Sequence, residues 1–438
     1  MPRPSLLLAL SFAAAGCAAE RAASTAGTPA DGATPAAPPS TRVVVERVTT
    51  KVPFPRGLAL MGDELLVLCR GRVREYGGVS ASVEDQAGTL YKVNPAVGEP
   101  FVAGSDPSDA VKENGTLFAA PDPTVFRLWD RTANPPWNDR LTDRPYCGLR
   151  YDPRTQNVFL CAFSGIDKKS EPGKSQFSKN LSDALLRYDT RTGKWHEVER
   201  HDVEAGGNYP HNDPNLAKPP HGWLNGPDNC LVVGRWLYAV AKDNSRLVRY
   251  DLAPIEADPA AGAPPSFFVL DEKVMVEGEG LVEFRGHSAL AQRDGQLYIA
   301  FRTSSQIVRI PLDAEGLPVQ PIVAQRVARF QPYDAATGKS ANLTDMAFGP
   351  NGDLFVISAS PSRVHRFRPD PAQVYDATDP KTPAWLELAQ LTGNPKMKSE
   401  NVLVDPRGRV YVTSGDAYDF QNGAGGVVWR ATEQPAGS

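Results

Sequence analysis

The sequence lacks the short motifs that mark many classes of enzyme. It contains no Cys-x-x-Cys-His haem site, no Gly-x-Ser-x-Gly nucleophile elbow, no Gly-x-x-x-x-Gly-Lys phosphate loop and no His-Glu-x-x-His zinc helix. It also lacks any long block of one charge, since 47 Lys and Arg stand against 51 Asp and Glu, for a net charge of −4. We therefore expect no nucleic acid among its partners, because proteins that bind nucleic acids carry a clustered basic surface. No run reaches about 18 apolar residues, so no membrane-spanning helix is predicted in the mature chain.

The N-terminus has the pattern of an export signal. Arg3 supplies a positive charge, residues 6–15 are apolar, and Gly16-Cys17 ends the segment. Residues 14–17, Ala-Ala-Gly-Cys, resemble the bacterial lipobox, with Ala14 where a Leu is usual. The resemblance implies that Cys17 is lipidated and becomes the new N-terminus. The alternative is ordinary signal-peptide cleavage, which would leave a soluble periplasmic or secreted protein.

The segment after Cys17 is predicted to be a flexible tether. Residues 18–40 are mostly Ala, Thr, Gly, Pro and Ser, and such a composition cannot bury a core. We therefore divide the chain into a signal segment (1–17), a tether (18–40) and a single folded domain (41–438). On this interpretation the protein is exported and lipid-anchored to the cell envelope, and the lipid is its only contact with the membrane. Ala18, directly after the Cys, resembles the residue found there in lipoproteins of the outer membrane, if the cell has one.

A unit of about 40–50 residues recurs along the rest of the chain. Each copy consists of an apolar strand, a tight polar turn, a second apolar strand, a loop, and a third strand with basic and aromatic residues. The turn Pro350-Asn351-Gly352-Asp353 contains the Gly that a two-strand hairpin needs. The six copies begin at Gly57, Gly148, Cys230, Ser288, Asp345 and Asn401.

Weaker apolar stretches predict a fourth strand in each unit. Examples are residues 267–270, 321–324 and 385–388. Six units of four strands predict an all-β fold, a six-bladed β-propeller. The sixth copy ends without a fourth strand, whereas residues 41–48 alternate in the manner of a strand. We expect this N-terminal strand to complete the last blade and to close the ring, which would remove exposed sheet edges.

The turn Asp405-Pro-Arg-Gly and the third-strand pattern Arg363-Val-His-Arg-Phe resemble those of NHL-repeat propellers and of the senescence-marker-protein (SMP-30)/gluconolactonase-like superfamily. The resemblance covers most of residues 42–431. It implies the same six-bladed fold.

One face of the predicted ring carries the long connections. In a four-stranded blade, the loops between strands two and three emerge on the same face as those that join one blade to the next. The long segments are 104–146, 164–183, 202–227, 271–286, 329–342 and 416–425. Binding residues usually lie on long loops of a rigid scaffold, so this face is expected to bind a ligand or a protein partner.

The first strands also begin on this long-loop face, around the central channel. The expected channel-lining positions are Arg56, Cys147, Asn229, Ser288, Thr344 and Glu400. Arg56 and four residues close to these positions or at the ends of second strands are the predicted ligand-binding set, the four being Arg70, Asp228, Lys242 and Arg302.

Two functions are consistent with this arrangement. The first is an exported propeller that binds its ligand or partner on the long-loop face, with no assigned catalysis. The alternative, implied by the gluconolactonase-like resemblance, is a lactonase or esterase in which a divalent cation in the channel polarises the substrate carbonyl. On that alternative, Asn229 and Glu400 bind Ca²⁺ or another divalent cation, and His287 or Asp345 transfers the proton.

The channel positions depart from the ligand set of that superfamily. Arg56 stands where its first carboxylate is expected, and Ser288 stands where an Asp is expected. No cofactor is therefore firmly predicted. Arg285-Gly286-His287 also resembles the His of pyrroloquinoline-quinone sugar dehydrogenases, but the glycine-rich signature of those enzymes does not follow it.

Besides Cys17 the chain has four cysteines, an even number for an oxidising compartment. Cys147 and Cys161 are equally distant from the tip of one predicted hairpin. A disulfide between them is therefore geometrically allowed, and two buried free thiols are the alternative. Cys69 and Cys230 belong to different blades, and no pairing is predicted for them.

Overall fold

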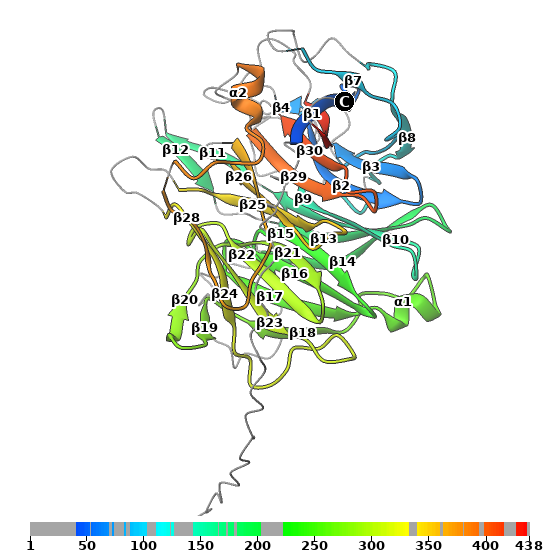
Figure 1. Ribbon diagram of the computed structural model, residues 1–438. Helices are drawn as coiled ribbons and strands as arrows, with labels where there is room; N and C mark the ends of the chain where they lie inside the picture. Colours follow the sequence, from blue (N-terminus) through cyan, green and yellow to red (C-terminus); the bar gives the residue numbers. More distant parts are fainter. Residues whose placement is uncertain are drawn as a thin grey trace, which may run out of the picture. The chain divides into compact units, whose positions relative to one another are not determined.

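The apolar runs of the repeat form consecutive antiparallel strands, and each group of neighbouring strands is one blade of a six-bladed β-propeller (Figure 1). The computed structural model describes residues 41–438 except 53, 70–71, 74–82, 85–87, 103–110, 123, 127–142, 165, 172–173, 179–181, 203–221, 333–339, 360–361, 380, 394–397, 416–425 and 436–438.

Blades 1 to 3 each contain four strands. Blade 1 consists of β2 (Pro55–Met61), β3 (Glu64–Cys69), β6 (Leu90–Val93) and β8 (Thr116–Ala119). Blade 2 consists of β9 (Asp143–Asp152), β10 (Asn157–Ser164), β13 (Ser182–Asp189) and β14 (Lys194–Asp202). Blade 3 consists of β15 (Pro227–Val233), β16 (Trp236–Ala241), β17 (Arg246–Asp251) and β18 (Ser266–Leu270). A short helix, α1 (Ala253–Ala257), joins β17 to β18.

Blades 4 to 6 vary at their outer edges. Blade 4 consists of β21 (His287–Arg293), β22 (Gln296–Phe301), β23 (Gln306–Pro311) and β24 (Gln325–Phe330), with β28 (Tyr375–Ala377) parallel to β24. Blade 5 consists of β25 (Leu343–Phe348), β26 (Leu354–Ala359) and β27 (Ser362–Phe367). Blade 6 consists of β29 (Lys398–Val404), β30 (Val410–Gly415), β31 (Val427–Pro435), β1 (Thr41–Thr49) and β7 (Glu99–Pro100).

The N-terminal strand closes the ring, as the sequence predicts. Strand β1 pairs with β31 from Thr41 opposite Pro435 to Thr49 opposite Val428. Around the channel, the first strands contact one another in the order β2, β9, β15, β21, β25, β29 and back to β2. The two ends of the folded region are therefore hydrogen-bonded within one blade, and the ring has no open seam.

Two of the three fourth strands quoted from the sequence are misplaced. The segment 267–270 lies in β18, but β24 begins at Gln325, after the predicted segment 321–324. In blade 5, Leu386 forms only an isolated bridge to Val364, and helix α2 (Leu388–Thr392) follows it. Outer strands bury one face at most, so their apolar pattern is too weak to fix their ends.

Three of the long connections contain a pair of short antiparallel strands in their described parts. Strands β4 (Arg72–Val73) and β5 (Val83–Glu84) pair in blade 1, and β11 (Ile166–Glu171) pairs with β12 (Lys174–Ser178) in blade 2. Strand β19 (Lys273–Val276) pairs with β20 (Gly280–Glu283) between blades 3 and 4. By topology all three emerge where the first strands begin, and Figure 1 shows β11–β12 and β19–β20 along one side of the ring. The predicted long loops 164–183 and 271–286 thus contain paired strands.

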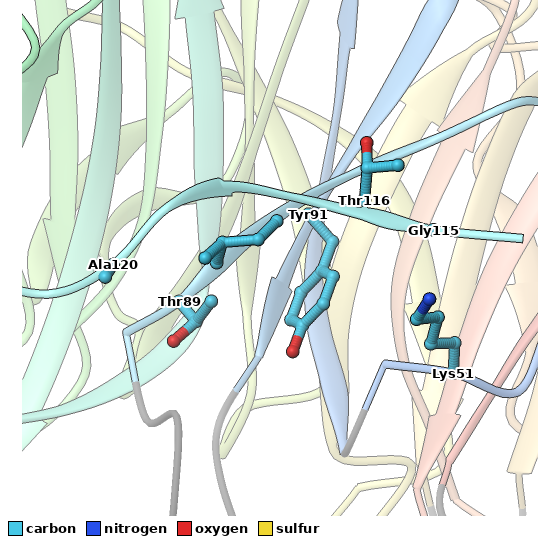
Figure 2. A pocket seen from close by; sticks show the side chains of 7 residues that line it. Lys51, Thr89, Tyr91, Gly115, Thr116 and Ala120 are labelled. Carbon is cyan, nitrogen blue, oxygen red and sulfur yellow. The ribbon is translucent and has the colours of Figure 1, made fainter. Parts of the chain in front are cut away.

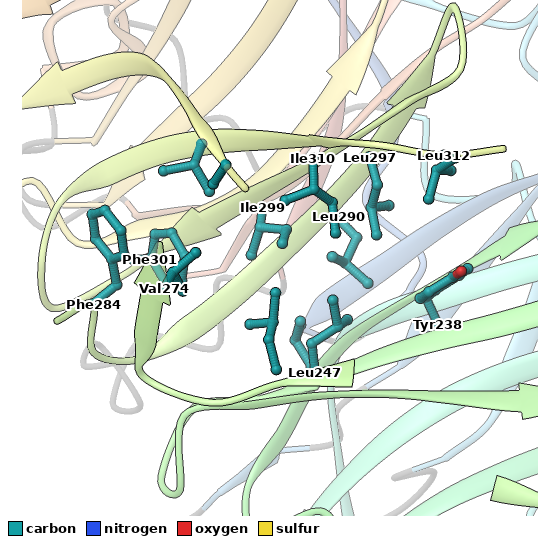
Figure 3. Packing of buried hydrophobic residues seen from close by; sticks show 14 of the residues in the cluster. Tyr238, Leu247, Val274, Phe284, Leu290, Leu297, Ile299, Phe301, Ile310 and Leu312 are labelled. Carbon is teal, nitrogen blue, oxygen red and sulfur yellow. The ribbon is translucent and has the colours of Figure 1, made fainter. Parts of the chain in front are cut away.

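The core lies between adjacent blades. Figure 3 shows the contact of blades 3 and 4, where Leu247 faces Leu290 and Ile299 beside the stacked rings of Phe284 and Phe301. Because each blade is covered on both sides, every residue of β16 and of β26 is buried. This explains the continuous apolar runs of the repeat, which an exposed sheet face would interrupt.

Candidate functional site

A β-bulge marks the start of the first strand in five of the six blades. The register against the second strand skips one residue there, and the extra residues are Arg56, Asp228, Ser288, Thr344 and Glu400. A bulge leaves its extra residue outside the ladder and redirects its side chain. In blade 2 the irregularity is larger, because Leu149 pairs with Leu160 but Pro145 pairs with Ala162. We call the five extra residues the bulge residues.

The register corrects one alignment made from sequence. The sequence analysis places Asn229 level with Glu400, but the residue level with Glu400 is Asp228. Asn229 instead follows the bulge, as Asp345 and Asn401 do in blades 5 and 6. A bulge shifts the count by one residue without changing the apolar alternation beyond it, so the pattern alone could not locate it.

Asp345 is the point where four blades meet. Its Oδ1 accepts a hydrogen bond from the side-chain amide of Asn229 at 2.7 Å and lies 3.6 Å from a guanidinium nitrogen of Arg150. Its Oδ2 accepts a hydrogen bond from the backbone N–H of Val402 at 3.0 Å. The carboxyl is fully buried, and burial raises its pKa, while Arg150 opposes the rise. Side chains of blades 2, 3 and 5 thus meet across the channel, together with the backbone of blade 6.

Two ion pairs connect bulge residues to their neighbours. Arg56 of blade 1 is paired with Glu400 of blade 6, and both side chains are buried. Asp228 of blade 3 lies 3.5 Å from Arg302, which follows β22 in blade 4. Arg302 also donates a hydrogen bond to the side-chain oxygen of Asn342, just before β25. These contacts join blade 6 to blade 1 and blade 3 to blades 4 and 5.

Three buried oxygens of this cluster have no hydrogen-bond partner in the described part of the chain. They are Oδ1 of Asp228, Oδ1 of Asn229 and Oγ1 of Thr344. The amide of Asn229 is oriented by Asp345, which accepts from its nitrogen and so leaves the oxygen as the open group. Oδ2 of Asp228 faces Arg302, which leaves Oδ1 as the open group of that carboxyl. Buried polar atoms without partners are rare in folded proteins, so these three oxygens are candidates for contact with a ligand or with water.

Asp228 titrates closer to neutrality than an ordinary carboxyl. Burial raises its pKa to about 6; Arg302 and Lys242 oppose the rise, and Asp243 and Glu400 add to it. Lys242 and Asp243 directly follow β16, so the charges at this end of the channel come from several blades. Around Asp228 and Asp345, four cationic side chains stand against four carboxylates: Arg56, Arg150, Arg302 and Lys242 against Asp228, Asp243, Asp345 and Glu400.

His287 is not part of this cluster. Its ring is fully buried and packs edge-on against Phe301, with ring centroids 4.7 Å apart. Neither ring nitrogen has a hydrogen-bond partner among the described residues. Burial lowers its pKa to about 3, although the backbone of Asp271 slightly favours the protonated form. The imidazole is therefore neutral and buried against the ring of Phe301, which does not suit the proton transfer suggested for it from sequence.

Some candidates cannot be placed. Arg70 and Cys17 lie outside the described residues, and for Cys147 only the backbone, within β9, is described. Arg150 and Asn342 were not predicted from the sequence. Arg150 lies within a strand and has no counterpart in the other copies of the repeat, and Asn342 precedes its strand, so neither carried a motif.

The disulfide that the predicted hairpin allows between Cys147 and Cys161 is not formed. Cys161 is a buried free thiol, as are Cys69 and Cys230. The irregularity in β9 removes the residue directly opposite Cys161 from the ladder. Cys161 instead packs in one apolar cluster with Cys230 of blade 3, and burial and the Cys230 thiol raise the pKa of the Cys161 thiol.

The cation ligands suggested from sequence do not fit the observed contacts. Glu400 is ion-paired with buried Arg56, whereas the side-chain amide of Asn229 donates a hydrogen bond to Asp345. Within the described ranges no three His, Cys, Asp or Glu side chains are grouped as a metal site would require. Because the surrounding charges already balance, a divalent cation here would leave the site strongly positive.

A cavity lined by other residues lies on blade 1. It measures about 530 Å³ and is lined by Lys51, Thr89, Tyr91, Gly115, Thr116, Leu117 and Ala120 (Figure 2). In Figure 2 the ring of Tyr91 lies between Thr89 and Lys51. Its size suits a small molecule. None of its lining residues was predicted to bind a ligand, and no carboxylate lines it.

The chain matches no protein-family model and no curated protein sequence. Among solved structures it is similar to the aldose sugar dehydrogenase of Escherichia coli (13% identity, TM-score 0.45, covering 90% of this chain and 100% of that one). It is also similar to regucalcin, a calcium-binding protein of Agrobacterium tumefaciens (9%, 0.45, covering 88% and 92%), and to a gluconolactonase of Xanthomonas campestris (12%, 0.40, covering 89% of each).

The order and contacts of the strands define the chain as a six-bladed β-propeller. At such low identities the likeness concerns the fold and transfers no activity. In the part of the chain that the structure describes, no helix is long and apolar enough to span a membrane.

Proposed function

We propose that the chain is a hydrolase of the lactonase or esterase type, with Asp228 as its acid–base residue. The observation that carries the proposal is the state of that carboxyl. It is fully buried, one oxygen faces Arg302, and the other has no hydrogen-bond partner among the described residues, as is also true of the side-chain oxygen of the next residue, Asn229. A general base needs an open lone pair and a pKa near the working pH, and Asp228 has both, with a pKa of about 6.

The reaction follows from the atoms present. Oδ1 of Asp228 removes a proton from a water molecule, whose oxygen then bonds to the carbonyl carbon of the substrate. On this proposal the oxyanion that forms is stabilised by the positive charge of Arg302, which is paired with Asp228, and of Arg56, which is paired with Glu400. When the intermediate collapses, the bond from the carbonyl carbon to the ring or ester oxygen breaks, and that oxygen takes the proton from Asp228. The products are a hydroxy acid, or an acid and an alcohol.

Asn229 and Asp345 act on this step through orientation. Asp345 fixes the amide of Asn229 with its oxygen exposed to the site, so Asn229 can accept a hydrogen bond from a substrate hydroxyl or from the attacking water. Such an acceptor favours substrates that carry hydroxyl groups. Asp345 is thus a positioning residue on this proposal rather than a catalytic one.

The test is a panel of lactones and aryl esters, assayed with EDTA, with Ca²⁺ and with Mg²⁺. Asp228→Asn should lower kcat at least about 100-fold, since it removes the only base assigned. The matched control is Asp405→Asn, a buried carboxylate paired with Arg409 in blade 6, which should retain activity. Full activity in Asp228→Asn, or no hydrolysis of any member of the panel by the parent protein, would contradict the proposal.

Export and lipid anchoring through Cys17 remain a proposal from the N-terminal sequence. Binding of a protein partner on the long-loop face likewise stays a proposal, and no contact described above selects a partner.

A further inference from the structure

Arg56 is a buried cationic side chain at the start of the first strand of blade 1. It is a bulge residue of blade 1, its side chain is 7% exposed, and it is paired with Glu400, a bulge residue of blade 6 that is 6% exposed. An arginine keeps its charge at every pH that a folded protein survives. The channel therefore holds a fixed positive charge beside its buried carboxylates.

Glu400 and the neighbouring bulge of blade 3 carry oxygens of the kind that bind hard cations. Oδ1 of Asp228 and Oδ1 of Asn229 have no hydrogen-bond partner among the described residues, and both side chains are fully buried. Glu400 is close enough to Asp228 to disfavour its ionised form. Carboxylate and amide oxygens are the ligands that Ca²⁺ prefers. The positive charges that oppose these groups come from Arg56, Arg302 and Lys242.

We infer that the Arg56 guanidinium takes the place of a divalent cation in this channel. The protein then binds no Ca²⁺ or Mg²⁺ there, and Arg56 neutralises Glu400 in the manner that a metal ion would. A second consequence, which rests on the proposed function, is that Arg56 supplies the positive charge toward the substrate carbonyl. The first consequence does not depend on any activity.

The inference is tested by removing the guanidinium and looking for a new cation site. Five proteins are compared: the parent chain, Arg56→Gln, Glu400→Gln, the double variant Arg56→Gln/Glu400→Gln, and Arg326→Gln. The last is the matched control, because Arg326 is also a buried arginine, held by two hydrogen bonds to Glu279 at 2.6 and 2.7 Å on the outer strand of blade 4. Each protein is titrated with CaCl₂ and MgCl₂, with the melting temperature and a calorimetric titration as readouts.

Arg56→Gln should gain one Ca²⁺ site, and its melting temperature should rise by about 2 °C once Ca²⁺ exceeds the new Kd tenfold or more. The parent chain and Arg326→Gln should show no saturable response. The double variant should lose the gained site, because Glu400 would be one of its ligands.

Two outcomes would overturn the inference. One is a saturable Ca²⁺ response of the parent chain that Glu400→Gln abolishes, which would mean that Arg56 does not occupy the place of the ion. The other is an Arg56→Gln protein that is folded by circular dichroism yet responds no more than Arg326→Gln does. If Arg56→Gln does not fold, the parent chain and Glu400→Gln are compared alone. A saturable Ca²⁺ response of the parent chain that Glu400→Gln abolishes then still overturns the inference.

Hydrolysis assays separate this inference from the proposed function. If the parent chain hydrolyses no substrate but the Ca²⁺ titrations behave as described, the function fails and the cation replacement stands. If the parent chain hydrolyses a lactone only with added Ca²⁺, the function stands and the cation replacement fails.

Discussion

Replacing His287 by Leu should change how the stability of the protein depends on pH. The folded state holds His287 as a neutral ring with a pKa of about 3, whereas an unfolded histidine titrates near 6.5. Between these two values the unfolded state binds more protons, so this residue destabilises the fold progressively as the pH falls below 6.5. At pH 5.0 the loss is about 2 kcal/mol, from about 1.5 pH units at about 1.36 kcal/mol each.

The leucine variant has no such proton to bind. The difference in unfolding free energy between His287→Leu and the parent chain should therefore grow by about 2 kcal/mol between pH 7.5 and pH 5.0. Packing changes, and the loss of two ring nitrogens that lack hydrogen-bond partners, act equally at both pH values and cancel in this comparison.

The assay is urea unfolding at pH 7.5 and pH 5.0, followed by tryptophan fluorescence and circular dichroism. His196→Leu is the control, because His196 is only half-buried, and its pKa is lowered by burial and by Arg187 without the full enclosure of His287. Its difference should change less with pH. A His287→Leu difference that is the same at both pH values would refute the reasoning, since it would mean that His287 is protonated in the fold.

Further predictions concern Asp228, the core, blade packing and the N-terminus. The rate kcat/KM should rise through an apparent pKa of about 6, seen in a pH–rate profile, and a profile flat from pH 5 to 8 would exclude Asp228 as the base. Trp429→Ala should cost about 3–5 kcal/mol in urea unfolding, because the ring is fully buried in blade 6, whereas Leu117→Ala, at a 63% exposed site, should cost under about 0.5 kcal/mol. Gly148→Ala should lower the melting temperature, because a Cβ there would lie 2.8 Å from Sγ of Cys161 and 2.9 Å from the Asn229 backbone; an unchanged value would show that blades 2 and 3 can separate. Labelling cells with a radioactive fatty acid should mark the chain but not Cys17→Ala, and equal labelling would exclude lipidation at that residue.

The sequence predicts the ring well because the ring depends on local patterns. The hairpin at Asp294-Gly295 shows why: both residues have positive φ, 51° and 67°, and the pair Asp-Gly is the usual signal for that turn. The closing strand was equally readable, since residues 41–48 had no other sheet to join. Alternation and turn residues report on neighbours in sequence, and a propeller is built mostly from such neighbours.

The site was harder to predict from the sequence because it depends on strand register and on contacts between residues that are far apart in the chain. Candidates such as Arg56, Asp228 and Glu400 could be selected as polar residues at strand starts. Their partners could not: nothing in the sequence links Asn229 to Asp345, 116 residues apart. The bulge in blade 3 shifts the count by one residue, so Asn229 was placed level with Glu400 in error, and the larger irregularity in blade 2 removes the residue opposite Cys161.

The bulge residues show why Asp228 is better explained by function than by folding. The same position holds Ser288 in blade 4 and Thr344 in blade 5, so the fold accepts an uncharged side chain there. A carboxyl whose pKa is raised to about 6 binds more protons in the folded than in the unfolded state, so its contribution to stability declines as the pH rises from about 4 to 6. Above pH 6 the ionised carboxylate costs the fold about 3 kcal/mol relative to its protonated form. This follows because the pKa lies about 2.2 above its ordinary value, and a pKa difference of one corresponds to about 1.36 kcal/mol. Asp228→Asn should therefore be more stable than the parent chain at pH 7.5 and similar to it at pH 4, while losing activity. An acid–base residue is expected to weaken the fold at neutral pH, and to occupy a position that the fold could fill with a neutral residue. Asp228 meets both expectations.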